Sequence, residues 1–261
     1  MFFPLIKVLD LEGFLELSYM PPNNWENRIK KPLKIYALWP RNDTWRSEFQ
    51  FEINYGDNVR VSTNNVNPEM LNSGVCLFYP TDEELVATLP VLPTKELWSS
   101  RIPEWRCTTG FTNGTAQTSY QSEIYPLPSK ASMLTFHPFI QFGNLFNYLL
   151  VLNIVREPVV RECKVELYNS TDLRSFGVES LRTNSANLIH LDPFGFQPTD
   201  LPLFFSREMA GIPFGLGVSV DGSMLSLEHT HPPASFVLFG NRNSVQGDIK
   251  KRWIQRIELV K

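Results

Sequence analysis

Apolar and polar residues alternate with a period of two in several separate segments of the chain. Residues 48–55 are the clearest case, because single polar residues separate their apolar ones: Phe49, Phe51, Ile53 and Tyr55. Successive side chains of a β-strand point to opposite faces of its sheet, so we expect these four side chains to share one covered face. Residues 14–19 and 34–39 are predicted to be strands as well, because each run is soon followed by proline.

The second half of the chain repeats this pattern. Residues 147–155 and 162–168 are predicted strands, and the second should direct its alternate residues inward: Cys163, Val165 and Leu167. Residues 56–58 and 221–222 have turn chemistry, so we expect each to close a hairpin. At the end of the chain, apolar residues recur at helical spacing and favour an amphipathic helix over an edge strand: Ile249, Trp253, Ile257 and Val260.

The composition strengthens the preference for strands. The chain has 19 Phe, 8 Tyr, 6 Trp and 20 Pro in 261 residues, and aromatic rings suit a pleated sheet whereas proline interrupts helices. We therefore predict an all-β fold with antiparallel β-sandwich architecture, two sandwich-like domains and few short helices. The expected domains are an N-terminal β-rich domain, 1–125, and a C-terminal β-sandwich domain, 126–261. Residues 108–122, rich in Thr, Gly, Ser, Asn and Gln, are predicted to connect them or to form an exposed loop.

Charge and cysteine content restrict the function classes. The net charge is −3 and basic residues cluster only at 250–252, which argues against a nucleic-acid partner. No apolar run is long enough to span a bilayer, and the N-terminus lacks the features of a signal peptide. Three widely spaced cysteines, Cys76, Cys107 and Cys163, fit neither a disulfide framework nor a metal knuckle, so they are predicted to be reduced thiols. A soluble, cytoplasmic protein is expected.

One compact group of metal-ligand types stands near the end of the chain, where His229 and His231 are separated by one residue. In a strand these two side chains would project from the same face, so both imidazoles could bind one metal ion. A third ligand would have to come from a distant part of the sequence. The candidates are His137, His190, Asp192 and Asp221.

This His-x-His pattern on a β-rich chain resembles the first motif of the cupins, in which two histidines and a following glutamate hold a metal. The resemblance implies a divalent metal at His229 and His231. It covers only these few residues: Ser235 stands where the family places its glutamate, and no second histidine motif follows. Because the ligand set is incomplete, we favour the interpretation in which the histidines hydrogen-bond to backbone or water and no cofactor is bound.

A second candidate site combines aromatic rings with planar polar groups. Aromatic faces and hydrogen-bonding amide, guanidinium and carboxylate groups are the combination that recognises sugar-like ligands. The predicted ligand-binding residues are Trp105, Arg106, Asn113, Tyr120, Gln121 and Glu123. The alternative interpretation is that the rings belong to a core or an interface and that the polar residues solvate a loop.

These observations favour a non-catalytic binding or assembly protein that recognises a carbohydrate or a protein partner through a polar-aromatic surface. The chain has no G-x-S-x-G elbow and no phosphate-binding glycine loop, so no catalytic residue is nominated and enzymatic activity stays open. The alternative is a metal-dependent enzyme acting on a sugar derivative, centred on His229 and His231. A homo-oligomeric scaffold that pairs through exposed strand edges is a third hypothesis.

Overall fold

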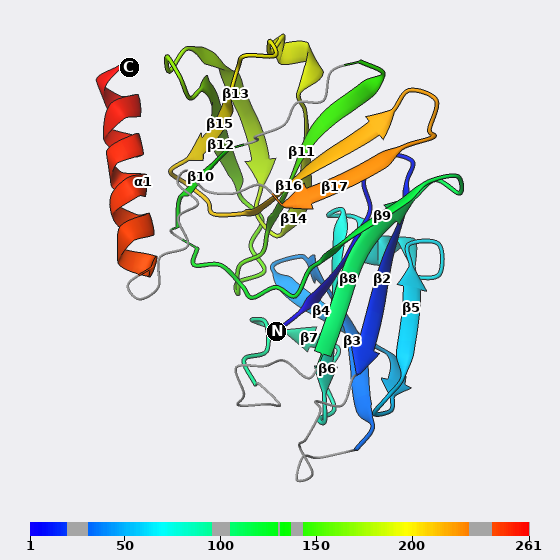
Figure 1. The fold of residues 1–261 in the computed structure, drawn as a ribbon. Helices are drawn as coiled ribbons and strands as arrows, with labels where there is room; N and C mark the ends of the chain where they lie inside the picture. The colour runs from blue at the N-terminus through cyan, green and yellow to red at the C-terminus, as the bar shows by residue number, and fades with distance from the viewer. Residues whose placement is uncertain (20–30, 96–104, 130, 137–142, 230–241, 261) are drawn as a thin grey trace.

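The computed structural model describes residues 1–19, 31–95, 105–129, 131–136, 143–229 and 242–260 (Figure 1). It confirms the predicted all-β, antiparallel, sandwich-like fold, with 53% of the chain in strands and 9% helical. The described strands form four antiparallel sheets, here called sheets I to IV.

Sheets I and II are built from the first part of the chain. Sheet I has the order β5 (Asn58–Ser62), β2 (Glu12–Tyr19), β8 (Trp105–Thr112), β9 (Gln117–Gln121). Sheet II has the order β1 (Phe3–Ile6), β6 (Val75–Thr81), β3 (Leu33–Arg41), β4 (Thr44–Ile53), β7 (Thr88–Leu89). A short 3-10 helix, η1 (Pro68–Leu71), lies between β5 and β6 in the chain.

Sheets III and IV are built from the second part. Sheet III has the order β14 (Ser185–His190), β11 (Leu145–Asn153), β16 (Ile212–Ser219), β17 (Leu225–His229). Sheet IV has the order β10 (Met133–Phe136), β15 (Pro202–Ser206), β12 (Glu162–Asn169), β13 (Ser175–Arg182). The 3-10 helix η2 (Asp192–Phe194) follows β14, and α1 (Arg242–Leu259) follows β17. The boundary between residues 125 and 126 stays a prediction as a domain boundary.

Clusters of buried apolar side chains fill the spaces between the sheets. One cluster fills the space between sheets I and II, with Leu15 and Leu17 facing Ile35 and Phe78. A second fills the space between sheets III and IV and contains the predicted inward residues of β12: Cys163, Val165 and Leu167. Each pair of sheets is therefore a sandwich with its own apolar core.

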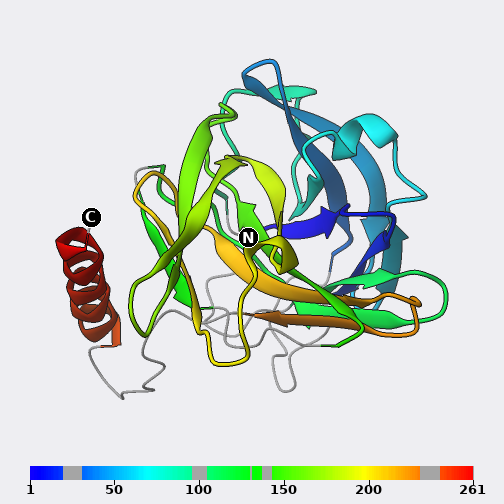
Figure 2. The same ribbon diagram turned by 90° about the horizontal axis from the view of Figure 1, so that it is seen from above.

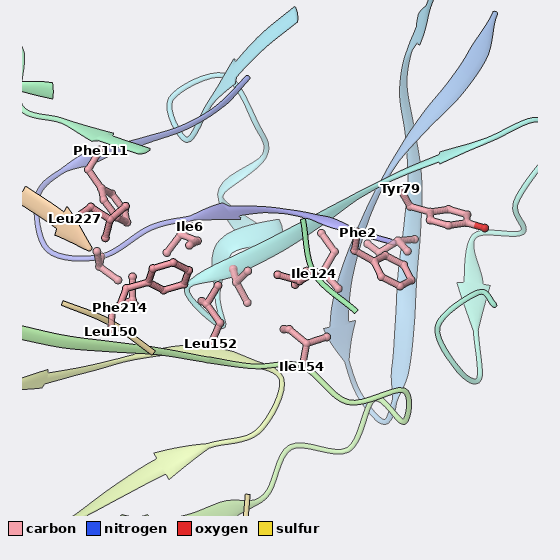
Figure 3. Close-up of a cluster of buried hydrophobic side chains, with 14 of the residues drawn as sticks. Phe2, Ile6, Tyr79, Phe111, Ile124, Leu150, Leu152, Ile154, Phe214 and Leu227 are labelled. Carbon is pink, nitrogen blue, oxygen red and sulfur yellow. The ribbon is translucent and has the colours of Figure 1, made fainter. Parts of the chain in front are cut away.

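A third cluster joins the two sandwiches through sheets II and III. Leu77 and Tyr79 of β6 lie in the same cluster as Leu150 and Leu152 of β11, and Figure 3 shows Leu150 and Leu152 near Ile6 and Phe214. Trp45, on β4, is completely buried in this cluster, and its indole N–H donates to the carbonyl oxygen of Arg156 at 2.8 Å. Residues 75–79 of β6 and 149–152 of β11 are consequently buried on both faces of their sheets.

Helix α1 covers the outer face of sheet IV, as the sequence pattern indicates. Ile257 is completely buried against Leu203 and Phe205 of β15, and Trp253 packs beside it. Figure 2 shows the helix on the side of the second sandwich that faces away from the first.

Three predictions about the first sandwich are wrong. Phe49 does not share the covered face of Phe51 and Ile53, because the pairing of β3 with β4 shifts at Ile35 and Tyr36. A residue inserted into one strand of a pair reverses the faces beyond it. As a result Phe49 is 49% exposed and contacts Tyr36, whereas Ile53 is buried.

The segment after residues 56–58 is the second error. It was predicted to form a hairpin with 48–55, but β4 belongs to sheet II and β5 pairs with β2 in sheet I. Backbone hydrogen bonds from Gly56 N to Tyr19 O and from Tyr19 N to Asp57 O direct the chain to the opposite sheet. Residues 108–122 also differ from the predicted connection, because most of them form β8, β9 and their turn. The 221–222 hairpin is confirmed by the pairing of β16 with β17.

Candidate functional site

The two candidate sites of the sequence meet where the sandwiches join. Strand β9, from the first sandwich, lies beside β17, from the second, in both ribbon views (Figures 1 and 2). The rings of Tyr120 and His229 stack with their centroids 5.9 Å apart and an interplanar angle of 27°. Phe214 presents its ring to both, at 5.8 Å from Tyr120 and 5.6 Å from His229. We call Tyr120, Phe214 and His229 the seam cluster.

Strand pairing explains why these rings face one another. His229 is directly opposite Phe214 in sheet III, and Phe214 belongs to the cluster that joins the sandwiches. Tyr120 is opposite Thr109 in sheet I, beside Phe111 of that same cluster. Directly opposed side chains in antiparallel strands project from the same face. The seam cluster is therefore the solvent-facing end of the contact between the sandwiches.

Exposure divides the seam cluster into a buried and an accessible part. Phe214 is 3% exposed, whereas Tyr120 is 38% exposed. A partly exposed aromatic ring held by a buried one offers a rigid apolar face with a polar hydroxyl at its edge. The cluster can therefore pack against an apolar surface and hydrogen-bond at its rim.

Gln121, another of the predicted ligand residues, lies on the opposite face of sheet I from Tyr120. Arg60 covers the ring of Phe14, with its guanidinium carbon 3.8 Å from the centroid. It also donates to Glu16 at 3.2 Å and to Gln117 at 3.1 Å. Gln121, opposite Thr108, is exposed at the edge of this face.

The remaining predicted ligand residues either hydrogen-bond to the backbone or have side chains outside the described part of the chain. Asn113 accepts hydrogen bonds from Thr115 N and Ala116 N and donates to the carbonyl oxygen of Gly222 at 2.7 Å, so it joins the turns of the two sandwiches. Glu123 accepts from the backbone N–H of Cys107 at 3.1 Å. The backbones of Trp105 and Arg106 pair with β2 at the opposite end of β8 from Asn113, and their side chains lie outside the described part.

The fold thus spreads the six predicted ligand residues along one hairpin. A strand advances about 3.3 Å per residue, which puts Arg106 and Asn113 roughly 23 Å apart. No single small ligand can contact both. Tyr120 and Gln121, as neighbours in β9, face opposite sides of sheet I, and the ligand-binding role of the six residues stays a prediction.

Only one of the two histidines predicted to bind a metal lies in the described part of the chain. His229 ends β17 within the seam cluster, whereas His231 and the candidate ligand His137 lie outside the described residues. Within the described residues, no group of three or more His, Cys, Asp or Glu side chains could hold a metal ion. The metal-dependent enzyme therefore stays a prediction.

The other three candidate third ligands have local partners. His190 donates to Asp192 at 2.9 Å and stacks on Tyr148 with the centroids 4.8 Å apart. Asp221 accepts from Ser219 and Ser223, and these hydrogen bonds, Ser223 foremost, lower the pKa of its carboxyl group to about 2. The Asp221 carboxylate thus orders the turn between β16 and β17, whereas the Asp192 carboxylate also accepts from the backbone and side-chain N–H groups of Asn147 on β11.

The pairing of His190 with Tyr148 was not foreseen from the sequence. It depends on the register of β11 against β14, in which these two residues are directly opposite. Both strands are visible as apolar runs, but a single sequence does not specify their register.

The cysteines are free and buried in the structure. Burial in apolar surroundings raises the pKa of the Cys76 and Cys107 thiols far above the ordinary value. A nucleophilic cysteine needs the opposite shift, because the thiolate is the reactive form. These thiols are therefore part of the cores and offer no nucleophile.

Comparison with known proteins gives no relative: no protein-family model, curated protein or solved structure matches the chain. In the described part of the chain, no helix has both the length and the apolar character required to cross a membrane.

Proposed function

We propose that this is a non-catalytic binding protein that recognises a carbohydrate through the polar-aromatic surface around Tyr120 and His229. The observation that supports the proposal is the stacking of these two rings, 5.9 Å apart, at the place where the sandwiches meet. Two residues singled out independently in the sequence, from opposite halves of the chain, thereby form one partly exposed surface.

The chemistry of the seam cluster suits a sugar. The C–H face of a pyranose packs on an aromatic ring, while its hydroxyls exchange hydrogen bonds with phenol and imidazole groups. The ring of Tyr120 is held in place by Phe214 and His229, so little side-chain freedom would be lost on binding.

Glycan-array screening of the purified monomer, followed by calorimetric titration with the best ligand, tests the proposal. We expect Tyr120→Ala to weaken binding about tenfold, because an aromatic contact is worth about 0.5–1.5 kcal/mol beyond its buried area. His229→Ala should weaken binding less, because Tyr120 stays in place for the sugar to pack on and loses only the ring stacked against it.

Tyr125→Ala is the matched control, because Tyr125 is also exposed (52%) but lies outside the seam cluster. It should leave the affinity unchanged. A flat response to all glycans would contradict the carbohydrate proposal. A protein partner, including a second copy of the chain, would then be sought by light scattering and by binding assays with the Tyr120→Ala variant.

A further inference from the structure

The turn between β8 and β9 contains the only Asn-Gly pair of the sequence, Asn113-Gly114. Both residues are exposed. Gly114 has a φ of +86°, and a Cβ added to it would meet no atom within 4 Å. Because glycine has no Cβ, no side chain obstructs the approach of its backbone nitrogen to the side-chain carbonyl carbon of Asn113, Cγ. This exposed turn is therefore a place where an asparagine can lose its amide group.

Hydrogen bonds hold the side-chain amide of Asn113 in one orientation. Its Oδ1 accepts from the backbone N–H groups of Thr115 at 3.0 Å and of Ala116 at 2.9 Å. When a nucleophile attacks Cγ, negative charge develops on Oδ1, and two fixed N–H donors stabilise that charge. The attacking nitrogen belongs to the next residue of the chain, so no entropy of association is lost. The turn thus favours cyclisation.

The side-chain nitrogen of Asn113 links the two sandwiches. Nδ2 donates to the carbonyl oxygen of Gly222 at 2.7 Å, in the turn between β16 and β17. From these two turns β9 and β17 run side by side toward Tyr120 and His229 (Figure 1). Loss of the amide removes the donor and leaves a carboxylate oxygen facing a carbonyl oxygen, and neither of these can donate a hydrogen bond.

We infer that Asn113 is a site of spontaneous deamidation, and that its conversion breaks the hydrogen bond between the turns of the two sandwiches. Hydroxide from the solvent removes the proton of the Gly114 backbone nitrogen, which forms a bond to Cγ of Asn113. The bond from Cγ to Nδ2 breaks, and Nδ2 takes a proton from water and leaves as ammonia. Water then opens the resulting succinimide at Cγ, which gives aspartate, or at the backbone carbonyl carbon of residue 113, which gives isoaspartate.

Peptide mass spectrometry of the native protein after incubation in mildly alkaline buffer tests the reaction. We expect deamidation to accumulate at Asn113, with isoaspartate among the products, while Asn42 stays unchanged. Asn42 is also exposed in a turn, but it precedes Asp43, whose Cβ hinders the cyclisation. Gly114→Asp gives the Asn113 turn the same pair, and aspartate tolerates a left-handed backbone, as Asp43 does at a φ of 57°. It should slow the conversion roughly tenfold, which corresponds to about 1.4 kcal/mol in the barrier.

Urea-unfolded protein, incubated in parallel, shows whether the folded turn permits the reaction. The inference is overturned if Asn113 stays intact in the native protein over the time in which the unfolded chain is converted. It is overturned as well if Asn42 is converted as fast as Asn113, or if Gly114→Asp leaves the rate unchanged.

Asn113→Asp contains one of the two products from the start, and it tests the effect on the link between the sandwiches. Hydrogen–deuterium exchange in residues 219–224 should become roughly two- to tenfold faster, as the loss of one hydrogen bond predicts. Asn42→Asp should leave these residues as in the wild type. Unchanged exchange there in Asn113→Asp would overturn the claim that the amide joins the turns. These measurements involve no sugar, so the carbohydrate proposal is judged separately by its own titration.

Discussion

Trp39 and Trp45 are both buried in the first sandwich, but only the N–H of Trp45 has an acceptor among the described residues. Replacement by Phe removes similar volume at each position, and at Trp45 it also removes a hydrogen bond to Arg156. We expect Trp45→Phe to lower the free energy of unfolding by about 2 kcal/mol and Trp39→Phe by about 1 kcal/mol. Urea denaturation of the two variants measures the difference. Equal losses would show that the Trp39 N–H is already satisfied in the free protein.

At the level of single residues, the sequence predicted burial well where alternation is regular and poorly where a register shift intervenes. The inward residues of β12 were correctly predicted, because that strand pairs without a shift through Val165. Phe49 was placed on the wrong face, because the shift opposite Ile35 and Tyr36 is a property of two strands together. The pocket lined by Trp39, Pro40, Arg41, Glu69 and Asn72 was not foreseen either, since its lining comes from segments about thirty residues apart in the sequence.

The packing of α1 on sheet IV gives a prediction at the level of one element. Ile257 is completely buried, whereas Leu259, in the same last turns, is 86% exposed. Ile257→Ala should lower the free energy of unfolding by about 2–4 kcal/mol, because it leaves a cavity between helix and sheet. Leu259→Ala should change it by less than about 0.5 kcal/mol. Thermal or urea unfolding of both variants provides the comparison, and equal effects would contradict the docking of the helix.

Asp82, the first residue after β6, forms ion pairs with two lysines. Lys95 and Lys31 donate to Asp82 at 2.8 Å and 2.9 Å, and these hydrogen bonds, Lys95 foremost, lower the pKa of Asp82 from 3.8 to about 2. Because the folded pKa is depressed, the stabilisation is present above about pH 3.8 and is lost as the pH falls toward 2. Both lysines are nearly half exposed, so the contribution is below about 1 kcal/mol.

Asp82→Asn should therefore flatten the loss of stability on acidification. We expect a slightly lower melting temperature than wild type at pH 7, and a smaller decrease between pH 4 and pH 2. Calorimetry across this range measures both slopes. Parallel slopes would show that Asp82 is not held by the lysines in solution.

Strands were easier to predict from the sequence than their partners. Residues 56–58 form a turn as expected, yet β5 joins the opposite sheet, because its pairing with β2 is a long-range choice that local turn chemistry does not determine. Residues 108–122 have the polar composition of a connection or an exposed loop. They form edge and near-edge strands of sheet I, whose outer face is polar.

At the scale of the whole molecule, sheets II and III form the middle layers. Residues 75–79 of β6 are all buried, and alternate ones belong to the core of the first sandwich and to the contact between the sandwiches. Residues 149–152 of β11 divide in the same way between the contact and the core of the second sandwich. Continuous apolar runs are typical of strands covered on both faces. The runs at residues 75–79 and 149–152 are therefore the feature of the sequence that indicates the contact between the sandwiches.

The contact between the sandwiches brings the residues of the seam cluster together. Leu152 is completely buried within it, facing sheet II, and Val165 lies only in the core of the second sandwich. Local truncation speeds amide exchange in the elements that depend on the lost contact.

Hydrogen–deuterium exchange of Leu152→Ala, compared with Val165→Ala, measures whether the two sandwiches are joined by this contact. The structure predicts faster exchange in β3 and β6 as well as in β11 for Leu152→Ala, and changes limited to sheets III and IV for Val165→Ala. Exchange changes confined to residues 133–229 in both variants would contradict the contact, and with it the surface formed by Tyr120 and His229.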